Sequence, residues 1–138
     1  MNQDMLNARS ILSQGAYTCV LCKGETVYCD SRRGVRPLLE LMNQGIDLRG
    51  FSAADKVVGK AAAFLYQLMG VHGVYAQVIS VPAKEVLDRS GLSVCCEKAV
   101  PAIQNWDKTG LCPLESAVWD ITDAATAKAV IEETLANL

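Results

Sequence analysis

The sequence predicts a mixed α/β domain in which one sheet lies between layers of helices. A buried strand over Val74–Ile79, a helix over Pro82–Ser90 and a second strand over Leu92–Cys96 follow one another closely. That order is typical of a right-handed parallel crossover. Two shorter apolar runs, Tyr17–Cys22 and Glu25–Asp30, flank a two-residue turn and predict a β-hairpin. Parallel and antiparallel pairs in one chain indicate a mixed sheet.

Helical spacing of apolar residues and helix-terminal signals predict helices in the rest of the chain. The third predicted helix has the clearest pattern, because Ser52–Asp55 resembles a capping box and Val57, Val58, Leu65 and Leu68 lie on one helical stripe. In chain order, these helices cover residues 4–14, 34–44 and 54–69, then one that begins near 109–115 and one from Asp123 to about 136.

The composition excludes several classes of protein. The 138 residues are 51% hydrophobic and 20% charged, a globular balance, and no repeat or linker divides them, so we expect a single domain over residues 1–138. A net charge of −2 argues against nucleic acid or a polybasic membrane surface as a partner. The N-terminus has no secretory signal and no apolar run is long enough to span a membrane, which predicts a cytoplasmic protein.

The six cysteines are expected to be buried thiols in a reducing compartment. Cys19 and Cys22 have a spacing seen in zinc sites, but they lie on a predicted strand. Positions i and i+3 of a strand point to opposite faces, so the two thiols should diverge. No second pair with such spacing exists, and His72 is the sole histidine. We therefore predict no metal and no cofactor.

Three segments resemble those of an uncharacterised bacterial and archaeal domain family. They are Asp55-Lys-Val-Val-Gly-Lys-Ala-Ala-Ala63, Thr109-Gly-Leu-Cys-Pro-Leu-Glu115 and Gly34-Val-Arg-Pro-Leu-Leu-Glu-Leu41. The resemblance extends from about Val20 to Asp120. That family is assigned to the cytidine deaminase-like fold. It implies a three-layer α/β/α domain with a five-stranded mixed sheet started by a β-hairpin.

The resemblance also allows a test for deaminase chemistry. Zinc deaminases place a His or Cys ligand at one helix start and Pro-Cys-x-x-Cys at the next. Lys56–Val58 aligns with the first motif, and Pro82–Val86 with the second. Ala83 and Val86 stand where the two thiols should be, and none of these side chains holds zinc. A zinc-dependent deaminase is therefore not expected.

The family likeness and the helix starts together predict a ligand site. Helix N-termini present free N–H groups that bind anions. Two starts are expected to meet at one cleft and to hold a small anionic metabolite or a nucleotide. The alternative is that these side chains only cap helices or face solvent. The predicted ligand-binding residues are Asp55, Lys56 and Lys60 from the first start and Asn105, Thr109 and Glu115 from the late loop and helix.

Cys112 is the candidate for covalent chemistry. Pro113 suits the first helical position, which makes Cys112 the N-cap and Glu115 the N3 residue of a capping box with sulfur in place of oxygen. Either capping is its whole role, or the helix dipole activates it as a catalytic nucleophile. His72 is expected to cap a helix C-terminus, and the basic turn Ser31–Gly34 is solvated or reaches an anionic ligand.

The leading prediction is therefore a zinc-free domain that binds a small anionic metabolite or nucleotide. The first alternative is a thiol-dependent enzyme that uses Cys112, and the second is a structural or partner-binding subunit. Helices rich in Ala and Leu leave apolar surface that one small sheet does not cover, so we also expect a homo-oligomer.

Overall fold

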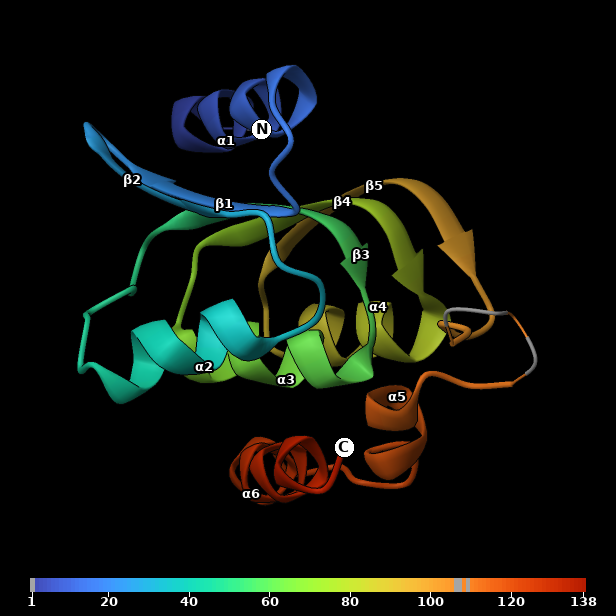
Figure 1. Cartoon of the computed structure of the whole chain (residues 1–138). Helices are drawn as coiled ribbons and strands as arrows, with labels where there is room; N and C mark the ends of the chain where they lie inside the picture. Colours follow the sequence, from blue (N-terminus) through green and yellow to red (C-terminus); the bar gives the residue numbers. More distant parts are fainter. Residues whose placement is uncertain (1, 106–107, 109) are drawn as a thin grey trace.

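Five strands form one sheet with the spatial order β2-β1-β3-β4-β5 (Figure 1). The computed structural model describes residues 2–105, 108 and 110–138. Strand β1 pairs antiparallel with both β2 and β3, and the β3-β4-β5 half is parallel. The strands are β1 (Cys19–Lys23), β2 (Thr26–Asp30), β3 (Ser52–Val58), β4 (Gly73–Ser80) and β5 (Ser93–Val100). The expected mixed sheet that starts with a hairpin is confirmed.

Helix α1 (Gln3–Gln14) covers one face of the sheet (Figure 1). Its side chains Met5, Ala8 and Leu12 are buried against residues of β1, β3 and β4, among them Val20 and Tyr75. Asn2 caps the helix, because its Oδ1 accepts a hydrogen bond from the backbone N–H of Met5 at 2.8 Å. One short helix therefore buries the apolar residues of this face.

The larger apolar cluster lies on the opposite face of the sheet, where the other helices lie (Figure 1). Helix α3 is buried along most of its length, and Phe64, Leu65 and Tyr66 are at most 1% exposed. Helix α4 packs beside α3, and α6 packs on α3 from the side away from the sheet. The helices on this side are α2 (Arg36–Asn43), α3 (Lys60–Met69), α4 (Val81–Arg89), α5 (Pro113–Ala117) and α6 (Ala124–Ala136).

The predicted helix over residues 54–69 is wrong in its first third. Ser52–Val58 is the central strand β3, and helix α3 begins only at Lys60 after the N-cap Gly59. Pairing with neighbouring strands determines the strand conformation of this segment, because β3 forms hydrogen-bond ladders with β1 and β4 and is buried on both faces. Ser52 does not start a capping box, because its hydroxyl donates to Asn2 Oδ1 at 3.1 Å.

The other elements follow the sequence patterns closely. The helix expected at residues 34–44 is α2, and the parallel crossover is β4-α4-β5. Asp123 caps α6 as predicted, with Oδ2 accepting from Thr126 N–H at 2.8 Å. Cys19 and Cys22 join the clusters on opposite faces of the sheet, which confirms that the two thiols diverge.

Candidate functional site

The starts of α3 and α4 lie at the carboxyl ends of the neighbouring parallel strands β3 and β4. Each helix follows its strand after at most one residue, so the two first turns lie at the same edge of the sheet. Ser80 caps α4, and its Oγ accepts a hydrogen bond from Ala83 N–H at 3.2 Å. Crevices at this edge of open α/β sheets are common ligand sites, so the groups that fill it decide what can bind.

The carboxylate of Glu115 fills this edge. Glu115 lies on α5 and is 1% exposed. Its Oε1 accepts from the backbone N–H of Lys60 at 2.6 Å and from Ser80 Oγ at 3.2 Å. Its Oε2 accepts from the backbone N–H of Ile103 at 2.6 Å. The buried charge therefore has charge-assisted hydrogen bonds at both oxygens and meets the positive end of the α3 dipole.

Gly59 makes room for this arrangement. A Cβ at that position would lie 3.2 Å from Ile103 Cγ1 and 3.4 Å from Glu115 Oε1. Both approaching groups belong to the chain itself. The anion-binding end of α3 is therefore occupied by an internal carboxylate.

An open groove lies beside the filled edge, between α3, α4 and the segment 119–122 that joins α5 to α6. Its volume is about 370 Å³. Phe64 and Val86 are buried core side chains that also line it, whereas the Trp119 side chain is 39% exposed. The lining residues are Lys60, Phe64, Gln67, Pro82, Glu85, Val86, Arg89, Ser90, Trp119, Asp120, Ile121 and Thr122. We refer to this cavity as the α3–α4 groove.

Charged groups of both signs line the α3–α4 groove. Lys60 Nζ donates to the backbone oxygen of Trp119 at 2.7 Å and lies 5.6 Å from the centre of the Phe64 ring. Arg89 approaches Glu85 at 3.9 Å, a loose pair with both side chains more than half exposed. Such a pair contributes little to stability, so the Arg89 guanidinium has capacity for another acceptor.

A model of the TM1506 family, described as a domain of unknown function (DUF1893), matches residues 7–135. The chain belongs to the DUF1893 family. The crystal structure of a DUF1893 family protein (TM1506) from Thermotoga maritima is similar to it, with 26% sequence identity and a TM-score of 0.86. The likeness covers 100% of this chain and 92% of that chain. No curated protein matches the sequence.

The DUF1893 match confirms the resemblance to a family of unknown function and extends it to nearly the whole chain. The Thermotoga maritima protein supports the strand and helix arrangement described above, because both chains are covered almost end to end. Neither comparison names a ligand, a substrate or a reaction, so the chemistry has to be inferred from the site.

The structure brings together only part of the predicted site. Lys60 and Glu115, which are 55 residues apart, meet through a main-chain N–H and a carboxylate. Lys56 was predicted to lie at a helix start, but it lies on β3. Its backbone N–H donates to Thr18 O at 3.0 Å. Asp55 also lies on β3, so the expected helix-start cluster of three side chains does not exist.

Asp55 instead belongs to a buried polar chain in the core. Tyr66 Oη donates to Asp55 Oδ2 at 2.7 Å, and Cys19 Sγ lies 3.4 Å from Tyr66 Oη. Burial raises the pKa of the Asp55 carboxyl to about 7, although hydrogen bonds from Tyr66 and the main chain partly offset it. Burial also raises the pKa values of Tyr66 and Cys19. The three groups are thus neutral or nearly so at acidic pH.

The late loop contributes less than predicted. Asn105 forms a local turn in which its Oδ1 accepts from Gly110 N–H at 3.3 Å. Thr109 lies outside the described residues. Cys112 is the N-cap of α5 as expected, but its side chain forms no capping hydrogen bond, and Glu115 turns away to Lys60 and Ile103. The predicted capping box with sulfur is therefore wrong.

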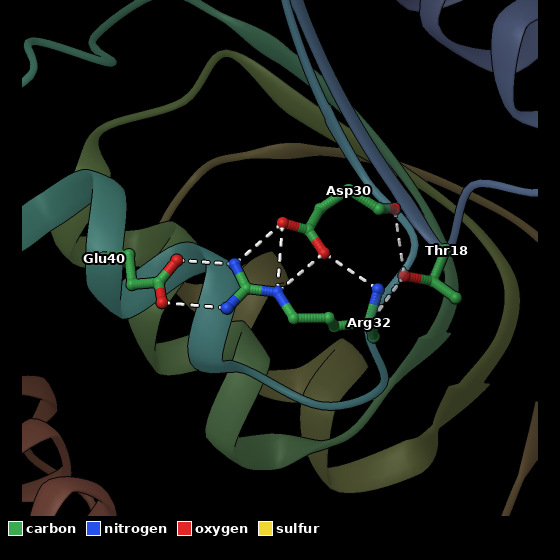
Figure 2. A network of polar contacts seen from close by, with 4 residues as sticks. All are labelled: Thr18, Asp30, Arg32 and Glu40. Carbon is green, nitrogen blue, oxygen red and sulfur yellow. Dashed lines mark hydrogen bonds and ion pairs between the residues drawn. The ribbon is translucent and has the colours of Figure 1, made fainter.

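The basic turn at Ser31–Gly34 is tied to carboxylates of its own chain (Figure 2). Arg32 binds Asp30 through Nη2 at 2.8 Å and Glu40 of α2 through Nη1 at 2.8 Å. These hydrogen bonds lower the pKa values of both carboxyls and raise the pKa of Arg32. Thr18 Oγ1 also donates to Arg32 O at 2.6 Å. The network links the hairpin to α2, so Arg32 has a structural role.

The remaining cysteines and the histidine form no shared site in the described part of the chain. Cys19 and Cys22 are buried as expected, whereas Cys29 and Cys96 are exposed and the other two are half-buried. His72 is exposed and lies two residues after Gly70, the C-cap of α3. Its backbone N–H donates a hydrogen bond to Phe51 O, and its backbone oxygen accepts one from Ser93 N–H. Among the described residues, no three His, Cys, Asp or Glu side chains lie close enough to share a metal ion.

Sequence analysis missed Arg89, Trp119 and Asp120, because they come from the end of one helix and from a connection thirty residues later. No spacing in the sequence links them. Ser80 was detectable, since Ser80-Val-Pro82 combines an N-cap residue with a proline in the first turn. No helix of the described chain is both long and apolar enough to cross a bilayer.

Proposed function

We propose that this chain is a zinc-free domain with the cytidine deaminase-like arrangement, and that it binds a small metabolite with an anionic group in the α3–α4 groove. The observation that carries the proposal is the groove itself. Its volume of about 370 Å³ lies within the range of small-molecule sites, and two cationic side chains, Lys60 and Arg89, line it.

The order of elements supports the deaminase-like part of the proposal. A hairpin, a central strand and two parallel crossovers place two helix starts at one edge of the sheet, as the resemblance implied. Ala83 and Val86 of α4 stand where the two zinc-binding thiols would be, and Ala83 is fully buried, whereas Lys56, aligned with the first motif, lies on β3 and not at a helix start. Ala83 and Val86 carry no nitrogen, sulfur or carboxylate donor for zinc, and a lysine ammonium has no lone pair to offer.

Because the Glu115 carboxylate already occupies the start of α3, the α3–α4 groove is the more suitable binding site for a ligand. A ligand anion at the start of α3 would have to displace the Glu115 carboxylate from the N–H groups of Lys60 and Ile103. Displacement would leave the buried Glu115 carboxylate without hydrogen-bond partners, which strongly destabilises the folded state. The groove needs no such rearrangement, because Arg89 already faces solvent there.

Thermal unfolding with added ligands tests the proposal. We expect a panel of inorganic phosphate, dicarboxylates and nucleoside monophosphates to include compounds that raise the Tm, since a ligand at a hundred times its Kd stabilises a protein by about 2.7 kcal/mol. Arg89→Gln should abolish that shift. Lys98→Gln, which removes an exposed charge from β5, is the matched control and should keep it. No shift with any compound would contradict the proposal.

The geometry gives less support to a thiol-dependent enzyme. Cys112 is half-buried at the N-cap of a helix of five residues. The sole histidine, His72, precedes β4, while α5 is bonded to the opposite end of that strand through Ser80 and Glu115. The strand separates the two ends by roughly 25 Å, too far for His72 to act as a base.

We also propose that the domain forms a homo-oligomer. Large apolar side chains are exposed at several positions, including Leu6, Val57, Leu68 and Val81. Association would remove part of this surface from water. Light scattering should give more than one chain per particle, and a strict monomer at high protein concentration would contradict the proposal.

A further inference from the structure

The outer edge of β5 presents main-chain groups without a partner. Strand β5 ends the sheet on one side, next to β4 (Figure 1). The backbone N–H of Ser93 donates to His72 O at 3.2 Å, so the main-chain groups of Ser93 face β4. Because these groups alternate in direction along a strand, those of Val94, Cys96 and Lys98 point away from β4. Within the described part of the chain, no hydrogen bond reaches them there.

The β5 edge has few of the features that keep strand edges from pairing. Such edges are usually short, or they carry proline, a bulge or charged side chains. Strand β5 has eight residues without proline, most of them exposed, whereas β2 at the opposite edge has five. Glu97 is bonded to Arg9 and Tyr75, which leaves Lys98 as the one charge of β5 that is unpaired in the described chain. A long row of free donors and acceptors is complementary to another strand.

We infer that the β5 edge is the interface with a second copy of this chain, which pairs its own β5 antiparallel about a two-fold axis at Cys96. This inference rests on the homo-oligomer of the proposed function and specifies its surface. The axis places Cys96 opposite the partner's Cys96, and Val94 opposite the partner's Lys98. All outward-facing residues then lie in facing pairs that exchange roughly six hydrogen bonds, two in each pair.

The charges of β5 favour this register over its neighbours. An axis at Glu97 would place two carboxylates directly opposite each other, and an axis at Lys98 would do the same with two ammonium groups, both of which are destabilising. The axis at Cys96 instead sets Glu97 opposite Cys95. It also sets Lys98 opposite Val94, which the aliphatic part of the lysine can cover while its ammonium reaches water. The strand is therefore complementary to itself, and one such symmetric contact closes a dimer.

Chemical cross-linking through Cys96 tests the interface. Opposite residues that exchange hydrogen bonds have Cα atoms ~5.5 Å apart, within reach of a short bis-maleimide. Cys96 and Cys29 are both exposed and lie on opposite edge strands, so the chain supplies its own control for random collisions. We expect a cross-linked dimer from the natural chain and from Cys29→Ser, and at least tenfold less of it from Cys96→Ser.

Lys98→Pro tests the main-chain hydrogen bonds. Proline removes an N–H that points away from β4, and such positions of edge strands tolerate it. Each dimer would lose two hydrogen bonds, so sedimentation equilibrium should show self-association at least tenfold weaker than in the natural chain. Lys98→Ala is the matched control, because it removes the charge and keeps the N–H, and its association should not change. Circular dichroism establishes that both variants are folded.

The outcomes separate this inference from the proposed homo-oligomer. Cross-linking through Cys29, or equal cross-linking in both serine variants, would overturn the inference while an oligomer with another interface stands. Unchanged association in a folded Lys98→Pro variant would overturn it as well. If that variant does not fold, the cross-linking of the natural chain decides. A natural chain that is monomeric at high concentration would overturn both the inference and the proposed homo-oligomer.

Discussion

The buried carboxyl of Asp55 should make the stability of this domain fall as the pH rises toward neutrality. Its pKa is about 7 in the folded chain against 3.8 for an unburied aspartate. The folded state therefore binds the proton more tightly than the unfolded state. Asp55 stabilises the fold fully below pH 3.8, and this contribution declines with rising pH and is lost above about pH 7.

The size of the effect follows from the two pKa values. One pKa unit corresponds to ~1.4 kcal/mol, so the full contribution is on the order of 4 kcal/mol. Between about pH 5 and about pH 8 the free energy of unfolding should fall by roughly 3 kcal/mol. Urea unfolding followed by circular dichroism measures this directly, and the slope with urea should stay constant across the pH series.

Asp55→Asn should remove the decline. The asparagine amide fits the site. Its oxygen can accept a hydrogen bond from Val57 N–H, and its NH₂ group can donate one to Tyr66 Oη. The Tyr66 hydroxyl can then donate its proton to Cys19 Sγ. Asp47→Asn is the control, since Asp47 is exposed and its pKa is lowered to about 2 by Arg49. A flat pH profile in the natural chain, or an unchanged decline in Asp55→Asn, would refute the reasoning.

Three further substitutions test other parts of the structure. Glu115→Gln should cost about 2–4 kcal/mol of unfolding free energy, because it places an NH₂ against a buried donor, whereas Glu133→Gln should cost almost nothing. Gly73→Ala should lower the Tm by several degrees, since its Cβ would lie 2.7 Å from the backbone oxygen of Ser93; an unchanged Tm would show that β4 and β5 can separate. Arg32→Gln should raise the pKa of Glu40 in NMR titrations while stability hardly changes, and a constant pKa would disprove the bridge.

The sequence was sufficient where local chemistry decided the structure. The hairpin, the β4-α4-β5 crossover and the Asp123 cap follow from turn residues, apolar runs and capping groups that act within a few positions. Strand β3 was misread because Ala53 and Ala54 are small, helix-compatible residues whose strand conformation depends on partners in β1 and β4.

The candidate site was less predictable for the same reason. Glu115 acts on Lys60 across 55 residues, and Asp120 reaches the groove only because α5 packs against α3. A sequence indicates that a helix start attracts anions, but it does not say whether the chain supplies its own. Lys60 and Glu115 were therefore correctly chosen as residues, while their mutual contact was not foreseen.

Helix α1 forms a region of the molecule that can open by itself. The buried side chains Met5, Ala8 and Leu12 hold it to the sheet, and Gly15 follows its last residue. The opposite face of the sheet keeps its own, larger cluster when α1 leaves. Amide hydrogens of α1 should accordingly exchange with solvent faster than those of β3 and β4, through a partial unfolding step that costs less free energy than global unfolding.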